Sequence, residues 1–193
     1  MAKARPVKGL NAHAPTGENA RMIARVRLEE LYGWDQYVDE PYRVRELHNM
    51  RIGAKRLRYT LEVFEDYLPE ACTQIVKELA QLQDELGALH DSDVMIALLR
   101  LCLGSEDGGT AYERVLAQAK QRQGKEKYLV QPELVADLVD PAVAPSAEER
   151  YGLEQLLSRL QHRREEQYTA FRQHWYQLRA RDFRREILEI LDA

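Results

Sequence analysis

The stretch RVRELHNMRIGAKRLRYTLEVFEDYL, from Arg43 to Leu68, decides the fold of this chain. Its apolar residues recur at alternating spacings of three and four, which predicts one long helix with an apolar ridge on one face. The members of this ridge are Leu47, Met50, Ala54, Leu57, Leu61, Phe64 and Leu68. Such a ridge must be buried by other elements, so the stretch favours a bundle of helices.

A second ridge lies one residue out of phase with the first, and it is basic. The members of this basic ridge are His48, Arg51, Lys55 and Arg58. At about 100° per residue, its far side is bounded by Ile52, Tyr59 and Val63. The cations therefore lie between two apolar stripes instead of on a solvated back. Packing in a bundle gives no reason for this placement, which indicates an anionic partner.

Composition sets limits on fold and partner. The 193 residues suffice for one domain or two small ones, and the scarcity of β-branched runs favours helices over sheets. Net charge is 28 − 32 = −4, so any anion binding must come from local clustering. Between Arg43 and Arg58, six Lys or Arg residues face the single acid Glu46, a local net charge of +5.

Neither the cysteines nor the apolar runs indicate secretion or a membrane. Cys72 and Cys102 lie in unrelated segments without CxxC spacing, which favours free thiols in a reducing compartment. No apolar run approaches the roughly 20 residues that span a bilayer. Residues 1–17 lack the apolar middle of a signal peptide. We therefore expect a cytoplasmic protein without membrane contact.

The rest of the chain predicts further helices around this stretch. Periodicity predicts helices over residues 18–37 and 70–101, and the second of these should pack antiparallel on the helix that contains the basic ridge. A capping box at Ser146 and Glu149 opens a long late helix, and Asp182 can cap a last short one. The expected fold is all-α: a disordered lead over residues 1–17, then a single domain of long antiparallel helices over residues 18–193, with an irregular excursion at about 104–145.

Three acidic residues are expected to pair with cations. The apolar period carries Asp93 onto the core-facing side of its helix, where an unpaired carboxylate is costly. We expect Asp93, with Asp91, to meet cations of the basic ridge. Glu62 follows Arg58 by four residues and should neutralise the lower end of that ridge. Because Asp84 and Asp91 point away from Asp93 on an ideal helix, pairing is favoured over a metal site, and no cofactor is expected.

These residues resemble the CHAD family, the conserved-histidine α-helical domain, over about residues 44–95. The matching motifs are Leu47-His48-x-x-Arg51-Ile52, Lys55-Arg56-Leu57-Arg58-Tyr59, Leu82-Gln83-x-x-Leu86-Gly87 and Asp91-Ser92-Asp93-Val94. The resemblance implies an all-helical domain that binds inorganic polyphosphate through a basic surface. The family usually holds two related halves, and this chain shows one. Either the second half is missing or a second copy supplies it, which makes a homodimer one of two expectations.

The resemblance also implies a set of polyphosphate-binding residues, to which face and charge add others. The matched positions are His48, Arg51, Lys55, Arg56 and Arg58. The additions are Arg21, Arg25, Lys77, Arg159 and Arg163. The expected function is non-catalytic binding, either free in the cytoplasm or at polyphosphate granules.

Three other functions compete with polyphosphate binding. The basic ridge could bind the phosphate backbone of RNA, although interleaved aromatics are lacking and the net charge is negative. The chain could be the accessory partner of a metal-dependent triphosphatase. Its own hydrolysis through Asp91 and Asp93 is disfavoured, because the acidic strands of a tunnel triphosphatase are absent. Finally, it could be a helical scaffold whose ridge pairs with Asp84, Asp91 and Asp93.

Overall fold

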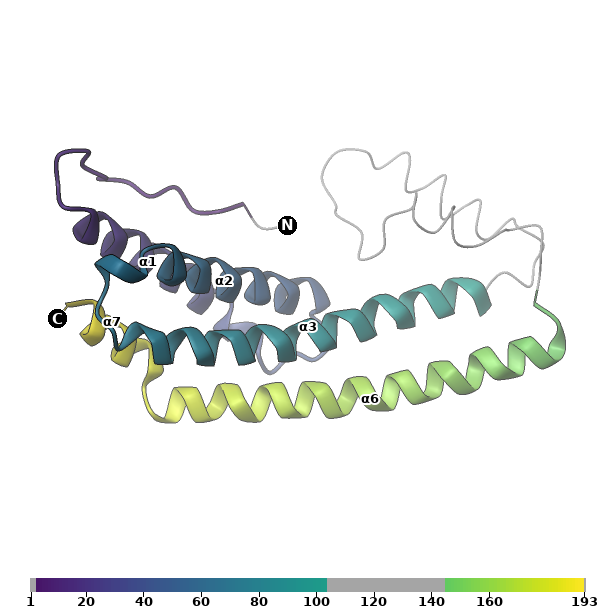
Figure 1. Cartoon of the computed structure of the whole chain (residues 1–193). Helices are drawn as coiled ribbons and strands as arrows, with labels where there is room; N and C mark the ends of the chain where they lie inside the picture. Colours follow the sequence, from purple (N-terminus) through teal and green to yellow (C-terminus); the bar gives the residue numbers. More distant parts are fainter. Residues whose placement is uncertain (1–2, 104–144, 193) are drawn as a thin grey trace. The chain divides into compact units, whose positions relative to one another are not determined.

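The computed structural model describes residues 3–103 and 145–192 (Figure 1). Every regular element within these residues is helical, which confirms the predicted all-α class. The elements are α1 Thr16–Tyr32, η1 Asp35–Tyr37, α2 Val44–Val63, η2 Glu65–Tyr67, α3 Cys72–Leu103, α6 Ala147–Ala180 and α7 Phe183–Asp192, where η denotes a 3-10 turn. The excursion predicted at about 104–145 lies outside the described residues except for Pro145.

The chain divides into two compact units. Unit 1 comprises Met1–His90 and Gln167–Ala193, and unit 2 comprises Asp91–Glu166. Both boundaries fall inside long helices, so α3 and α6 each contribute one part to each unit. The whole basic ridge belongs to unit 1, with α1, α2 and α7.

The helix boundaries follow local chemistry. α6 begins with the predicted capping box: the Glu149 N–H donates to Ser146 Oγ at 3.3 Å, and the Ser146 N–H donates to the Glu149 carboxylate at 2.8 Å. α1 begins at Thr16, inside the lead predicted for residues 1–17. Asn11 of that lead is held to α1, because its N–H donates to the Asn19 side chain at 3.1 Å.

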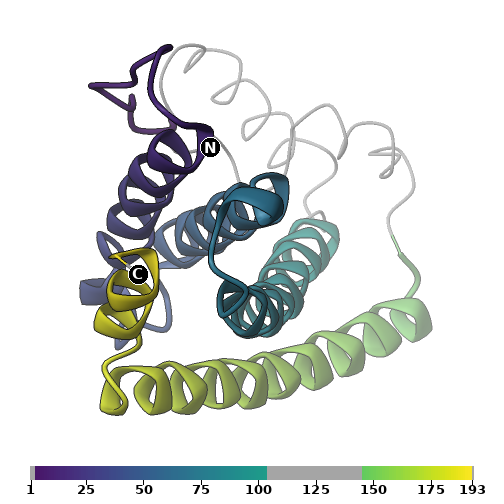
Figure 2. The same ribbon diagram turned by 60° about the vertical axis from the view of Figure 1, so that its left-hand side comes forward.

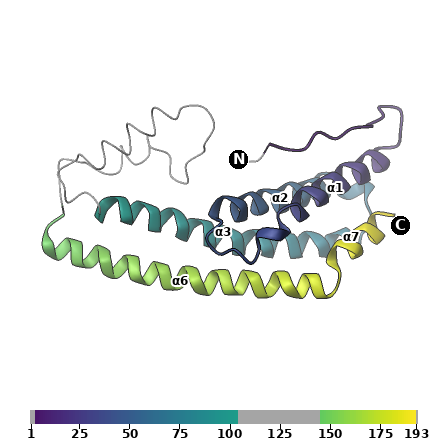
Figure 3. The same ribbon diagram turned by 180° about the vertical axis from the view of Figure 1, so that it is seen from behind.

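The core of unit 1 forms around the apolar ridge of α2. Leu47, Met50, Ala54, Leu57 and Leu61 are all fully buried. They pack with apolar residues of the neighbouring helices, namely Leu28, Leu31, Leu79, Leu82, Leu86, Phe171, Trp175, Phe183 and Ile187. Figures 1 and 3 show α2 beside α1 and beside the first part of α3, and Figure 2 shows α7 next to α1.

A glycine sets the closest approach of α1 and α2. A Cβ on Gly53 would lie 3.0 Å from the Cα of Leu31. Only a residue without a side chain allows the two backbones to come this close. The crossing fixes which face of α2 is turned toward α1, and it leaves the basic ridge on another face.

Polar contacts tie the C-terminal part of α6 to the segment after α1. The Trp175 indole donates to Asp35 at 2.7 Å, and the Tyr168 hydroxyl donates to the Val38 carbonyl at 2.8 Å.

Asp39 accepts hydrogen bonds from Arg172 at 2.6 Å and from the Tyr176 hydroxyl at 2.8 Å. These bonds join residues more than 120 positions apart in sequence, and so fix the C-terminal part of α6, from Gln167 onward, within unit 1.

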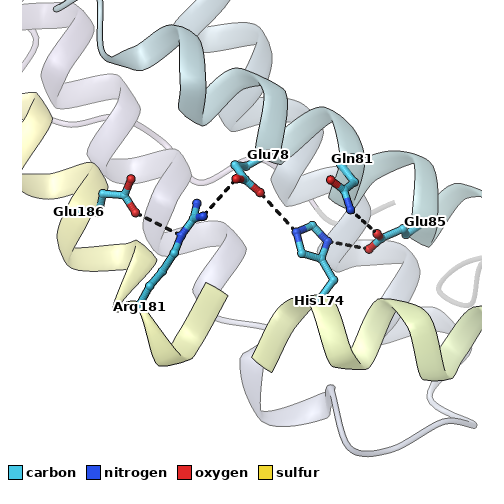
Figure 4. A network of polar contacts seen from close by, with 6 residues as sticks. All are labelled: Glu78, Gln81, Glu85, His174, Arg181 and Glu186. Atoms are coloured by element: carbon cyan, nitrogen blue, oxygen red, sulfur yellow. Dashed lines mark hydrogen bonds and ion pairs between the residues drawn. The ribbon is translucent and has the colours of Figure 1, made fainter. Parts of the chain in front are cut away.

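A histidine links the same part of α6 to α3 (Figure 4). His174 Nδ1 lies 2.8 Å from Glu85, and its Nε2 lies 3.3 Å from Glu78. Arg181 joins Glu78 to Glu186, at 3.1 Å and 3.3 Å. The hydrogen bond with Glu85 raises the pKa of His174 above its ordinary value, with Glu78 acting in the same direction. The charged imidazole can donate to both carboxylates at once.

Candidate anion-binding surface

The basic ridge of α2 lies along α3, and two contacts fix the register between the helices. The rings of His48 and His90 lie with centroids 4.1 Å apart, tilted by 37°. The Arg51 guanidinium lies against Gly87. As residue numbers rise along α2, the facing residue numbers on α3 fall. The two helices are therefore antiparallel, as predicted. The same register places Lys55 level with Gln83.

Gly87 makes room for Arg51. A Cβ built on residue 87 would lie 3.3 Å from Arg51 Nε and 3.6 Å from its Nη2. The guanidinium thus occupies the space that a side chain would fill at this position. Arg51 is half-buried as a result, and its position depends on α3 as well as on its own helix.

Several buried polar atoms along this α2–α3 boundary are unsatisfied. Among the described residues, His48 Nδ1, Arg51 Nε, Arg58 Nε and Gln83 Oε1 are buried without a hydrogen-bond partner. Leaving such atoms unsatisfied costs free energy, about 1–3 kcal/mol each. In a folded protein they are normally satisfied by water, an ion or a ligand. Three of the four belong to the basic ridge, so this surface is suited to an anion.

Electrostatics keep the ridge positive while limiting the charge on its histidine. Burial, acting with the nearby His90 and Arg51, lowers the pKa of His48 to about 4. Arg58 lies 3.5 Å from Glu62, which offsets part of its charge. Lys55 is exposed, with Nζ 5.3 Å from the centroid of the Tyr59 ring. The charge available to a ligand therefore centres on Arg51 and Lys55.

The remaining predicted cations of α1 and α2 lie away from this ridge. Arg56 is turned toward α1, where it lies 3.5 Å from the buried carboxylate of Glu30. It lines a cavity of about 140 Å³ together with Lys3, Arg5, Trp34 and Asn49. Arg56 directly follows Lys55, so the turn of the helix moves it off the face that the ridge occupies.

Arg21 and Arg25 are also placed elsewhere. Arg25 forms an ion pair with Asp192 at the end of α7. Arg21 is half-buried and acts on the thiol of Cys72 at the start of α3, where its charge lowers the cysteine pKa against the larger, raising effect of burial. Their shared face, inferred from the four-residue spacing, therefore does not extend the ridge.

Three further predicted cations are exposed on long helices. Lys77 is exposed on α3 in unit 1, and Arg159 and Arg163 are exposed on α6 in unit 2. They provide matched surface charges for the experiments below.

Asp93 has a different partner from the predicted one. It was expected to pair with the basic ridge, but its Oδ1 accepts a hydrogen bond from Arg164 Nε of α6 at 2.7 Å, inside unit 2. Both side chains are buried, at 8% exposure each. Arg164 interrupts the apolar period of α6 between Leu160 and Tyr168, which was the available signal for this pair. Asp91 is exposed.

Three residues of α3 at the ridge were not predicted as site residues: Gln83, Gly87 and His90. The family motif already contains Gln83 and Gly87, and the antiparallel packing of α3 on α2 was predicted. Combining these two signals would have placed both residues opposite Lys55 and Arg51. His90 follows at the next turn of the same helix face.

Neither a metal site nor a membrane-spanning helix is present in the described residues. Within residues 3–103 and 145–192, no group of three or more His, Cys, Asp or Glu side chains is arranged to hold a metal ion. In the same ranges, no helix combines the length and the apolar character needed to cross a membrane.

Comparison with known proteins shows the family. No curated protein and no solved structure matches the chain. One family model, the CHAD domain, matches residues 4–100, which is half of the chain. The matched range contains α1, α2, the whole basic ridge and the α3 residues that face it. On this evidence the chain belongs to the CHAD domain family.

Proposed function

We propose that this protein binds inorganic polyphosphate, or a similar linear polyanion, through the basic ridge without hydrolysing it. One observation carries the proposal: His48 and Arg51 present buried nitrogens without hydrogen-bond partners among the described residues, and Arg58 Nε, which lies 3.5 Å from Glu62, makes no hydrogen bond either. These nitrogens lie in a stretch of local net charge +5 within a chain of net charge −4. The CHAD family is itself associated with polyphosphate and triphosphate chemistry.

Each ridge residue offers a different contact to a chain of phosphates. Arg51 and Arg58 carry planar guanidinium groups, which bind phosphate oxygens in pairs. Lys55 contributes a mobile point charge at the exposed centre of the ridge. A ligand that contacts several cations displaces counterions, so its affinity should fall steeply as salt rises.

Binding without hydrolysis is favoured by the groups on the ridge. The described ridge residues are imidazole, guanidinium and ammonium groups, and the neighbouring carboxylate of Glu62 faces Arg58 at 3.5 Å. Guanidinium and ammonium groups stabilise phosphate charge but do not activate water, and the lowered pKa of His48 makes its neutral imidazole a weak base. We expect no phosphate release from polyphosphate, with or without added magnesium or manganese. Release that tracks the purified protein would overturn this part of the proposal.

RNA binding is the second candidate, and one residue favours it. Tyr59 is 43% exposed, and Arg58 Cζ lies 5.0 Å from its ring centroid. An exposed ring beside a cation can stack on a nucleobase. Competition between polyphosphate and RNA of matched charge at physiological salt separates the two functions. Polyphosphate should displace RNA at equal phosphate concentration, and Tyr59→Ala should leave polyphosphate binding intact.

The direct test reverses the charge of the ridge. The triple variant Arg51→Glu, Lys55→Glu and Arg58→Glu should lose retention on a polyphosphate resin. The matched control carries the same charge change at Lys77, Arg159 and Arg163, three exposed cations that are not members of the ridge. Circular dichroism and thermal unfolding check that both triple variants fold. The single variant Lys55→Glu, at an exposed position, gives a second reading with little risk to the fold. Retention of the ridge variant equal to that of the control would refute the proposal.

A further inference from the structure

The contact between His48 and His90 gives the ridge a group whose charge can change on binding. The two rings lie 4.1 Å apart between centroids, one on α2 and the other on α3. His48 is half-buried, and its Nδ1 has no hydrogen-bond partner among the described residues. His90 lies against the ring, so the ring nitrogens are the polar groups with which His48 can meet a ligand.

The neighbouring groups that lower the pKa of His48 are a guanidinium, which is positive, and a second imidazole, which is positive when protonated. On its own helix the neighbour is Arg51, and on α3 it is His90. No carboxylate is among the groups that shift its titration in the described part of the chain. In the free protein, burial and these neighbours lower the pKa of His48 to about 4. The ring is therefore neutral at physiological pH.

A bound phosphate reverses this balance. An opposite charge within about 4–6 Å favours the charged form of an imidazole. The phosphate also offsets the repulsion from Arg51 and supplies acceptors for the imidazole edge. A neutral imidazole has one donor and one acceptor, whereas the protonated ring has two donors. Only the protonated ring can present donors alone to an anion.

We propose that polyphosphate binds to the basic ridge together with a proton, which His48 takes up, and that the contact with His90 helps to keep His48 uncharged until the anion arrives. This inference rests on the proposed function, because it concerns the same ligand at the same surface. His48 then forms one subsite with Arg51, whose guanidinium lies against Gly87. The protonated His48 adds a third positive group beside Arg51 and Lys55.

Linkage fixes the sign of the effect. If the complex holds one more proton than the free protein, affinity must rise as pH falls. For a single proton the change approaches tenfold per pH unit, over the range between the free and bound pKa values. Terminal phosphates of the ligand also titrate near pH 6, so the effect of His48 is the difference in slope between protein variants with the same ligand.

The experiment measures binding of long-chain inorganic polyphosphate to the full chain from pH 5.5 to 8 at fixed ionic strength. Calorimetry in buffers of different ionisation enthalpy counts the protons taken up. The wild type should take up protons, and its affinity should rise more steeply on acidification than that of His48→Gln. His90→Phe keeps a ring against His48 but removes the second imidazole, so His48 charges more readily before binding. We expect its proton uptake to be smaller than that of the wild type at the acid end of this pH range, because burial still lowers the pKa of His48 in the variant.

Controls separate this proposal from the proposed function. His162→Gln removes an exposed histidine that pairs with Glu166 in unit 2 at 3.4 Å, and should keep the wild-type slope. If His48→Gln fails to fold, the imidazole NMR signals of His48 in the wild type, with and without polyphosphate, give the same answer. Equal slopes for wild type and His48→Gln, or an unchanged His48 titration, overturn the proton linkage and leave polyphosphate binding standing. Unchanged uptake in His90→Phe overturns the role of His90. Absence of binding at every pH refutes the proposed function itself.

Discussion

The guanidinium of Arg51 lies where residue 87 has no side chain. A Cβ on Gly87 would lie 3.3 Å from Arg51 Nε, tighter than an ordinary contact, so Arg51 would have to shift. The position of a ridge cation on α2 thus depends on a glycine of α3. Glycine in a helix interior lowers helix stability relative to alanine. A substitution at residue 87 can therefore affect stability and ligand binding in opposite directions.

Gly87→Ala should weaken polyphosphate binding without destabilising the protein. Alanine gains up to about 1 kcal/mol of helix stability, which offsets the crowding of Arg51, while the displaced guanidinium loses contacts to phosphate. The matched control is Gly152→Ala on α6, where an added Cβ meets nothing within 4 Å. It should gain helix stability and leave binding unchanged. Affinity measurements and thermal unfolding check both variants, and equal affinities would show that Gly87 does not position Arg51.

His174 should stabilise the fold in acid and lose that effect as pH rises. Its folded pKa is raised, first by the hydrogen bond with Glu85, from an ordinary value of 6.5. A base with a raised folded pKa gives its full stabilisation below the unfolded pKa and loses it as pH passes the folded value. His174→Gln should therefore cost about 1–3 kcal/mol below pH 6.5 and progressively less above it. Urea unfolding at several pH values measures this, and a cost that does not change with pH would contradict it.

His48 should show the opposite dependence in the absence of ligand. Its folded pKa is lowered to about 4, mainly by burial, so the unfolded chain binds a proton more readily between pH 4 and 6.5. Stability should then fall as pH drops through this window. In His48→Gln this part of the dependence disappears. The difference in the free energy of unfolding between wild type and variant, measured by urea titration at pH 4.5 and 7, should grow with pH. A constant difference would show that His48 is not held neutral.

Removing either side chain of the buried pair Asp93 and Arg164 should lower the free energy of unfolding. Removing one partner leaves the other charge buried, which typically costs about 3–5 kcal/mol. Asp93→Ala and Arg164→Ala should each destabilise the protein by that order. The double variant should cost clearly less than the sum, because the loss of their mutual contact is then counted only once. A double-mutant cycle by urea unfolding provides the measurement, and simple additivity would show that the two side chains are not coupled.

A homodimer stays a prediction, derived from the single recognisable half of the family pattern. Pairing about a two-fold axis would place two basic ridges in one particle and lengthen the surface open to polyphosphate. Sedimentation at micromolar concentration, with and without polyphosphate, tests this expectation. A monomer under both conditions would eliminate it, and a dimer formed only with polyphosphate would indicate ligand bridging instead.

The sequence by itself determined the features that depend on local spacing. The three-and-four period defined α2 and its two ridges, because side chains three and four apart share a helix face. The capping box of Ser146 and Glu149 and the pair of Arg58 and Glu62 lie within one helical turn. The CHAD motifs also lie on single helices, so the family could be identified without a fold.

Only the tertiary structure decided which neighbour covers each helix face. Arg56 and Lys55 are adjacent in sequence, yet Arg56 meets Glu30 of α1 while Lys55 stays exposed. Asp93 pairs with Arg164, a residue 71 positions away, instead of with the ridge. The physical reason is common to both. Periodicity fixes the direction of a side chain around its own helix axis, whereas its partner depends on how separate helices pack, which no local pattern records.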